Sequence, residues 1–446
     1  MKILTNANAG ALLVAFCCAT RGFAAVDRSF NPGTGVAGGD EEGAHVVVPL
    51  RDGRILLGGD FGTFNGVFRP DLALLRPNGS LDESILLPGG VDGDEEPAIW
   101  SVGFQPDGNI IVSGNFRTVS GIARQGLARL HPNGALDTAW LPQVGSLTNL
   151  PRRSSVLSDG RVLVWNLFGL ERLNADGSVD TTFDVALDGF VFNGVSVQSD
   201  GRILVAGYFF DPRAGVTGQK VVRLLANGSV DVTFTANQFV GPPFGAEQMP
   251  DGRVLVFGGF TSVAGGARPG LALLHADGRL DTTARFTGAR DYVRLARPVS
   301  DGSIVAYSES VGPEPDALDV TVFTEPPRGQ RLKGRPWSVE FTVFPNGYVY
   351  DIAEDARGRI LIAGEFWELN GVRVPTGIAR FVRRGQPFPS LGHAPTHRVG
   401  VPLSRGSVLL GPLSRQRAGT ALRPNRGNAN CKMKSANCKL CRVRVG

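Results

Sequence analysis

Short apolar runs separated by Asp-Gly pairs recur along most of the chain. An Asp-Gly pair between two apolar runs predicts a β-hairpin, with a type I′ turn that needs positive φ at both central residues. Successive turn glycines stand 41 to 56 positions apart, a period typical of propellers and solenoids. The pairs are Asp52-Gly53, Asp107-Gly108, Asp159-Gly160, Asp200-Gly201, Asp251-Gly252 and Asp301-Gly302, with Arg357-Gly358 as a seventh.

A second Gly turn follows most of these hairpins and ends in aspartate. Examples are Asn78-Gly79 followed by Asp82, and Asp176-Gly177 followed by Asp180. Two hairpins in about 50 residues form one four-stranded antiparallel sheet, the unit of a propeller blade. The pattern therefore predicts an all-β fold, a β-propeller of about seven four-stranded antiparallel blades. Six blades are the alternative, because the copies near residues 165–168 and 303–310 depart from the pattern.

A glycine followed two positions later by phenylalanine stands between the two hairpins of five copies. We assign both residues to structure, because glycine permits close backbone approach and phenylalanine can fill the wedge between adjacent sheets. These residues are Gly59, Phe61, Gly114, Phe116, Gly207, Phe209, Gly258, Phe260, Gly364 and Phe366.

The segment 26–30 has the sequence of a repeat end. Val26-Asp27-Arg28-Ser29-Phe30 matches Val179-Asp180-Thr181-Thr182-Phe183. The last copy, after Ile378 to Phe381, has no fourth strand of its own. We therefore predict that residues 26–30 complete the final blade, which closes the ring and removes two exposed sheet edges.

The repeats resemble the delta-60 repeat family of bacterial exported β-propellers. Gln105 to Phe116 and Leu173 to Phe183 are similar to the two halves of that repeat, and the resemblance covers about residues 26–383. It implies a propeller fold and a location outside the cytoplasm. It implies no established activity and carries over no functional residue.

Composition divides the chain into three parts. Residues 1–24 read as a signal peptide, with Lys2 before an apolar stretch and small residues near the end, and cleavage after Ala24 is expected. Residues 25–384 form the propeller and contain no cysteine. Residues 385–446 are basic and lack the repeat, so we predict a disordered tail. We predict an exported protein, periplasmic, cell-surface or secreted, with no transmembrane span, since no other apolar run reaches about 18 residues.

Charge and cysteine lie mainly in the tail. Residues 395–446 hold eleven Lys or Arg and no acid, so the net charge of +5 leaves −6 for residues 1–394. The chain therefore gives no reason to expect a nucleic-acid partner. Cys431, Cys438 and Cys441 could supply three zinc ligands, but a fourth is missing.

Charged clusters precede several hairpins and carry our binding-site prediction. The segments before the first two hairpins are acidic, and those before the third and sixth are basic. A propeller gathers these loops at one mouth of its channel, so we predict a ligand-binding face there. Its residues are Asp40, Glu41, Glu42, Asp94, Glu95, Glu96, Arg152, Arg153, Arg290 and Arg294. Ca²⁺ could be held by Asp40, Glu41, Asp92 and Asp94, with solvated loop acids as the alternative; no other cofactor is expected.

No motif of a known catalytic machinery occurs, and no catalytic residue is predicted. The chain lacks a Gly-x-Ser-x-Gly elbow, a phosphate loop and His-Glu-x-x-His, and His45 is assigned to packing. We predict a monomeric, non-catalytic extracytoplasmic binding or scaffold propeller that recognises a protein or glycan of the cell envelope through one loop face. The alternatives are a propeller hydrolase or lyase with an acidic site at the channel mouth, and a structural cell-surface protein.

Overall fold

A computed structural model describes most of the repeat region. The described residues are 25–39, 43–93, 96–144, 147, 153–185, 187, 189–211, 216–235, 238–309, 318–326, 338–343 and 345–382. The predicted signal peptide, the C-terminal tail and its three cysteines lie outside them. No helix occurs in the described residues, and thus none there is suited to crossing a membrane.

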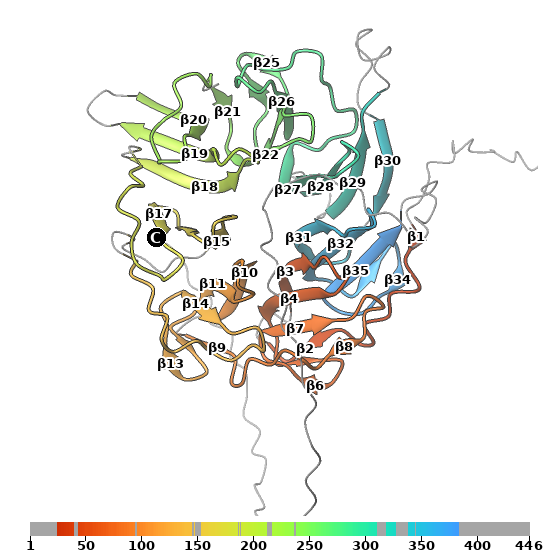
Figure 1. Cartoon of the computed structure of the whole chain (residues 1–446). Coiled ribbons are helices and arrows are strands. Elements are labelled where there is room, and N and C mark those ends of the chain that lie inside the picture. The colour runs from red at the N-terminus through yellow and green to blue at the C-terminus, as the bar shows by residue number, and fades with distance from the viewer. Residues whose placement is uncertain are drawn as a thin grey trace, which may run out of the picture. The chain divides into compact units, whose positions relative to one another are not determined.

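Seven antiparallel sheets lie around a common axis (Figure 1), as the repeat predicts. In six of these sheets the strands follow chain order from the axis outward, whereas in the seventh β1 lies outside β35; most of the innermost strands contact one another around the axis. Blades 1 to 3 are β3 (Gly43–Pro49), β4 (Ile55–Asp60), β7 (Leu72–Leu75) and β8 (Leu81–Asp82); β10 (Ala98–Phe104), β11 (Ile110–Asn115) and β14 (Leu127–Leu130); and β15 (Arg153–Val156), β16 (Val162–Trp165) and β17 (Leu170–Leu173).

The other four sheets continue the ring. They are β18 (Phe190–Val197), β19 (Ile203–Asp211) and β20 (Val216–Leu224); β22 (Pro243–Gln248), β23 (Val254–Gly258) and β26 (Leu271–Leu274); β27 (Tyr292–Pro298), β28 (Ile304–Glu309), β29 (Leu318–Thr324) and β30 (Ser338–Val343); and β31 (Tyr348–Glu354), β32 (Ile360–Glu365), β35 (Ile378–Val382) and β1 (Ala25–Val26). The sixth copy, whose sequence departs most from the repeat, thus forms a four-stranded sheet.

The first strand closes the ring, as predicted. In β1, Ala25 pairs with Val382 and Val26 with Phe381 of β35. The backbone N–H of Asp27 then donates to the carbonyl oxygen of Arg380 at 2.8 Å. In blades 2 to 5 the fourth strand is reduced to single bridges, at Leu136, Val179, Val230 and Leu280.

The predicted type I′ geometry of the Asp-Gly turns is wrong. Only the glycine has positive φ, 87° at Gly53, and Asp52 is not among the residues with positive φ. Asp52 instead accepts the N–H of Arg54 through its side chain at 3.0 Å, so these are three-residue turns that end in a left-handed glycine. Positive φ at two successive residues occurs at Asn65 (50°) and Gly66 (74°), in the small hairpin of β5 (Thr63–Phe64) and β6 (Val67–Phe68).

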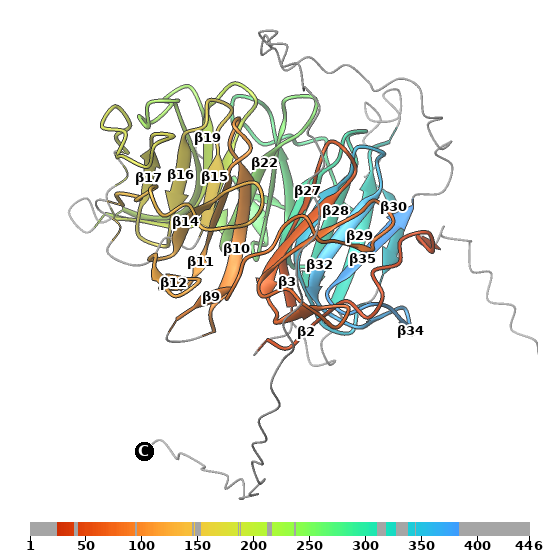
Figure 2. The same ribbon diagram turned by 60° about the horizontal axis from the view of Figure 1, so that its bottom comes forward.

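Small hairpins of this kind lie on one face of the ring. They are β5–β6, β12–β13 (Thr118–Val119 and Ile122–Ala123), β24–β25 (Ser262–Val263 and Gly266–Ala267) and β33–β34 (Glu368–Leu369 and Val372–Arg373). Three of them pair with a short strand that leads into an innermost strand: β2 (Val36–Ala37), β9 (Val91–Asp92) and β21 (Phe239–Val240). Figure 2 shows β2, β9, β12 and β34 along the same side.

Apolar clusters between neighbouring blades form the core. Phe61 packs with Leu361 of blade 7, and Phe116 packs with Leu72 of blade 1. Phe260 and Phe366 occupy the equivalent places in other wedges and are buried, whereas Phe209 is partly buried. Four of the five phenylalanines are thus buried in clusters between blades, and Phe209 is not.

In the described residues an arginine links adjacent blades at four places, and three of the four arginines are buried. Arg223 of β20 donates through Nε to Asp231 at 2.7 Å and through Nη1 to the carbonyl of Ala276 in the next blade at 2.5 Å. Its guanidinium lies 4.6 Å from the centre of the Phe234 ring. The equivalent sets are Arg129–Asp137–Trp140, Arg172–Asp180–Phe183 and Arg380–Asp27–Phe30. The repeated aspartate and aromatic residue of the sequence pattern therefore join blades together.

Candidate functional site

Six innermost strands carry a β-bulge at the same place, close to the start of the strand. Each bulge inserts one residue that has no partner in the neighbouring strand, and such an insertion turns a side chain away from the regular pleat. The inserted residues differ widely in chemistry. They are His45, Trp100, Asn193, Phe244, Arg294 and Tyr350. We refer to these six as the bulge residues.

The repeated glycine stands beside five of the six bulges, and in blade 6 Ser308 takes its place. A Cβ atom on Gly114 would lie 2.0 Å from the carbonyl oxygen of Ala98, and one on Gly59 would lie 2.2 Å from that of Gly43. Such distances are far below van der Waals contact, so any side chain would push the bulged strand away. The predicted close approach of backbones is confirmed, and it occurs between the first two strands of one blade.

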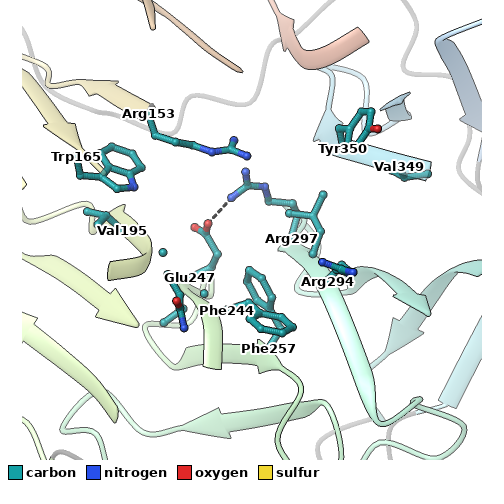
Figure 3. Close-up of a pocket in the computed structure, with 15 residues that line it drawn as sticks. Arg153, Trp165, Val195, Phe244, Glu247, Phe257, Arg294, Arg297, Val349 and Tyr350 are labelled. Carbon is teal, nitrogen blue, oxygen red and sulfur yellow. Dashed lines mark hydrogen bonds and ion pairs between the residues drawn. The ribbon is translucent and has the colours of Figure 1, made fainter. Parts of the chain in front are cut away.

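A cavity of about 350 Å³ lies among the innermost strands of five blades (Figure 3). Four of the bulge residues line it: Asn193, Phe244, Arg294 and Tyr350. The remaining lining includes Arg153, Trp165, Glu247, Phe257 and Arg297. The wall therefore combines guanidinium groups with aromatic rings, and its residues come from five blades of one repeated frame.

An ion-pair network crosses the cavity. Arg297 donates through Nη1 to Glu247 Oε1, and its Nη2 lies 3.5 Å from Asp351 Oδ1. Burial raises the pKa of Glu247 above its usual range. The positive charge of Arg297 lowers this pKa, but by less than burial raises it. The other oxygen of Asp351 accepts the backbone N–H of Val47 at 3.0 Å, which ties blade 7 to blade 1.

The other two cavity arginines have different surroundings. Arg294 donates through Nε to Glu309 Oε2 at 2.8 Å and lies over the Tyr292 ring at 5.1 Å. Arg153 lies over the ring of Trp100 at 5.8 Å and donates to its carbonyl oxygen at 3.4 Å. Desolvation lowers the pKa of Arg153 below its ordinary value.

His45 lies in an aromatic cluster next to the cavity. Its ring makes edge contacts with Tyr350 at 4.7 Å and Trp100 at 6.4 Å between centroids. Burial, together with the charge of Arg153, lowers the pKa of His45 to about 4, so the imidazole is neutral at pH 7. The prediction that His45 packs is consistent with these contacts.

The structure brings together only part of the predicted site. Arg153 and Arg294 both line the cavity. Arg290 instead pairs with Asp319. Asp92 and Glu96 are exposed; Asp92 lies in β9 and pairs with Thr118. Six of the predicted site residues lie outside the described residues: Asp40, Glu41, Glu42, Asp94, Glu95 and Arg152.

The calcium hypothesis depends on the same loops. Three of its four residues, Asp40, Glu41 and Asp94, fall outside the described ranges. Within the described part of the chain, no group of three His, Cys, Asp or Glu is placed to hold a metal ion. A calcium site at this mouth therefore stays a prediction.

Sequence reasoning missed most of the bulge residues, although a signal for them exists. His45 precedes Gly59 by 14 positions, and the same spacing of 14 separates Trp100 from Gly114 and Tyr350 from Gly364. Counting back 14 positions from each repeated glycine would have identified five of the six, while Arg294 stands 14 positions before Ser308. Glu247 and Arg297 have no comparable signal, because their meeting depends on how adjacent blades pack.

The fold and the cavity define this chain as a β-propeller with an axial pocket. Five segments match the family described as "Domain of unknown function (DUF5122) beta-propeller", at residues 50–84, 105–139, 157–183, 198–234 and 250–283. These matches support a β-propeller repeat family, while the narrower resemblance to delta-60 repeats stays a prediction. The comparison with curated proteins gave no match.

Solved propellers resemble the chain in fold. The WD40 beta propeller domain of Doa1 has a TM-score of 0.50 at 12% identity, over 78% of this chain and 96% of that chain. A GH74 xyloglucanase from Xanthomonas campestris has a TM-score of 0.41 at 13% identity, over 75% of this chain and 53% of that chain. At such identities the first likeness shows the fold alone, and function must be argued from the site.

Proposed function

We propose that this chain is an exported, non-catalytic binding propeller whose ligand is a glycan or protein of the cell envelope. The observation that carries the proposal is the set of bulge residues: one repeated position, six different side chains, and a cavity of about 350 Å³ lined by four of them. A repeat fold keeps a common frame while a variable position of this kind gives specificity. Cavities of this size with aromatic walls and a few polar groups are typical of ligand sites.

Binding of glycans or envelope proteins by the mature body, residues 25–384, tests the proposal. The wild type is compared with Arg294→Ala on a glycan array and in capture from an envelope extract. The matched control is Arg279→Ala, since Arg279 is also an exposed arginine in an ion pair, with Asp277, but lies in a turn away from the cavity. We expect the bound set to shrink in Arg294→Ala and to stay the same in Arg279→Ala.

Two results would reject the proposal. Identical binding by the wild type and both variants would show that the cavity is not the site. Turnover of a bound glycan that stops in Glu247→Gln would replace the proposal with the hydrolase or lyase alternative, because Glu247 is a carboxyl group of the cavity wall. Fractionation of the protein with the envelope without any ligand would favour the structural alternative.

A further inference from the structure

We infer that the cavity binds an acidic sugar ring, with Arg153 holding the carboxylate of a uronic acid. The inference rests on the proposed function and specifies its ligand. It depends on three features of the cavity: one arginine without an acidic partner, acids that restrict the charge of the ligand, and aromatic walls.

Arg153 is the cavity arginine that forms no ion pair with a carboxylate among the described residues, although Asp351 acts on its charge. Arg297 is paired with Glu247 and Asp351, and Arg294 with Glu309. The contacts of Arg153 are the ring and the carbonyl of Trp100. A guanidinium that forms no ion pair is free to receive a ligand carboxylate through two parallel N–H···O bonds.

The surrounding charges favour a ligand with a single negative charge. Asp351, which Arg297 holds, already adds negative potential at Arg153, and Glu247 lies in the same network. A phosphate carries close to two charges at neutral pH and would be repelled more strongly by these acids. A carboxylate satisfies Arg153 with one charge and a planar geometry that matches the guanidinium.

The walls favour a sugar ring as the carrier of that carboxylate. Trp165, Phe244 and Tyr350 provide aromatic surface around the cavity, and Asn193 adds an amide (Figure 3). Aromatic faces are suited to the C–H faces of a pyranose, while polar groups can bond its hydroxyls. The cavity volume of about 350 Å³ lies at the small end of the range for ligand pockets, which suits one ring or two and excludes a folded partner.

Calorimetric titration of the mature body separates the parts of this inference. The probes are D-glucuronate and D-galacturonate, with D-glucose to test the ring without its charge and acetate to test the charge without the ring. We expect binding of at least one uronate, weaker or undetectable binding of D-glucose and acetate, and an affinity that falls with added salt.

Variants of Arg153 test its role directly. Arg153→Gln should weaken uronate binding by about tenfold or more, which is the usual effect of removing a charged hydrogen-bond donor. Arg153→Lys keeps the positive charge but lacks the planar guanidinium, and this variant should bind uronate with intermediate affinity. Arg279→Gln serves as the control and should bind like the wild type. Arg153 is exposed to the cavity, so these variants should keep the wild-type melting temperature.

The outcomes distinguish this inference from the proposed function. Uronate binding that Arg153→Gln leaves unchanged would overturn the inference. Absence of uronate binding by the wild type would also overturn it, yet glycan or protein binding that depends on Arg294 would still support the proposed function. Equal binding of glucose and glucuronate would show that the ring is recognised and the carboxylate is not.

Discussion

Replacing Asp27 with asparagine should destabilise the propeller at the point where the ring closes. Arg380 is 1% exposed, and both its Nε and Nη2 lie 2.9 Å from Asp27 Oδ2. Asparagine keeps the shape of the side chain but removes the carboxylate that pairs with the buried guanidinium, leaving only the more distant charge of Asp355. Loss of one partner of a buried ion pair costs about 3–5 kcal/mol, and we expect a loss of that size in the free energy of unfolding.

The chain contains a matched control in Asp231→Asn. Asp231 binds Arg223 with the same contacts and similar burial, but inside the repeat region. Urea unfolding should show a similar loss for both variants. Hydrogen exchange should distinguish them, because only Asp27→Asn loosens a chain terminus, so exchange should accelerate at residues 25–30 in that variant alone.

A second substitution tests the cause of the loss. Blades 1 and 5 carry Leu74 and Leu273 at the position of Arg380, so leucine is compatible with this place in a blade. Adding Arg380→Leu to Asp27→Asn removes the unpaired charge and should recover a large part of the lost stability. A loss below about 1 kcal/mol for Asp27→Asn, as in an exposed ion pair, would refute the buried closure.

Acid should weaken the same closure. Burial tends to raise the pKa of Asp27, but hydrogen bonds from Ser29 and the charge of Arg380 outweigh it, so the pKa is lowered in the folded state. A lowered pKa contributes stability above the unfolded value of about 3.9, and that contribution is lost as pH falls below it. The stability difference between the wild type and Asp27→Asn should therefore shrink below about pH 4.

Three further predictions follow from other features. Gly59→Ala should lower the free energy of unfolding by roughly 2–4 kcal/mol, since its Cβ would meet the Gly43 carbonyl. Gly66→Ala, whose Cβ would point into open space, should lower it by about 1 kcal/mol. Equal losses of stability would contradict the bulge argument. N-terminal sequencing of exported protein should begin at Ala25, and retention of residues 1–24 would reject the signal peptide. If calcium binds at the mouth, titration should release heat that Asp92→Asn reduces, and no heat would remove the metal hypothesis.

Hairpins, blades and ring closure could be predicted because each depends on local patterns that recur at a fixed period. Closure was visible because segment 26–30 repeats the sequence of a blade's end. The predicted turn type was wrong because an Asp-Gly pair is compatible with more than one type of turn. Side-chain hydrogen bonding by Asp52 stabilises a three-residue loop in which only Gly53 needs positive φ.

The cavity could be predicted only in part, for a physical reason. Arg153 and Arg294 could be predicted as site residues because they lie in charged segments before the innermost strands. Loops at that position gather near the axis. Glu247 and Arg297 come from different blades, and their contact depends on the angle and register between two sheets. No pattern within one repeat encodes that relation.

The third blade shows that a departure from the repeat can mark the site. Asn166 stands where other copies carry the glycine beside the bulge, and Trp165, one position earlier, pairs with Arg153. Both side chains line the cavity (Figure 3). Trp165 provides an aromatic wall at a position where three other blades carry the small residues Gly58, Ser113 and Ala206. The copy that fits the repeat poorly thus supplies the arginine on which the acidic-sugar inference depends, as expected where function overrides a regular structural pattern.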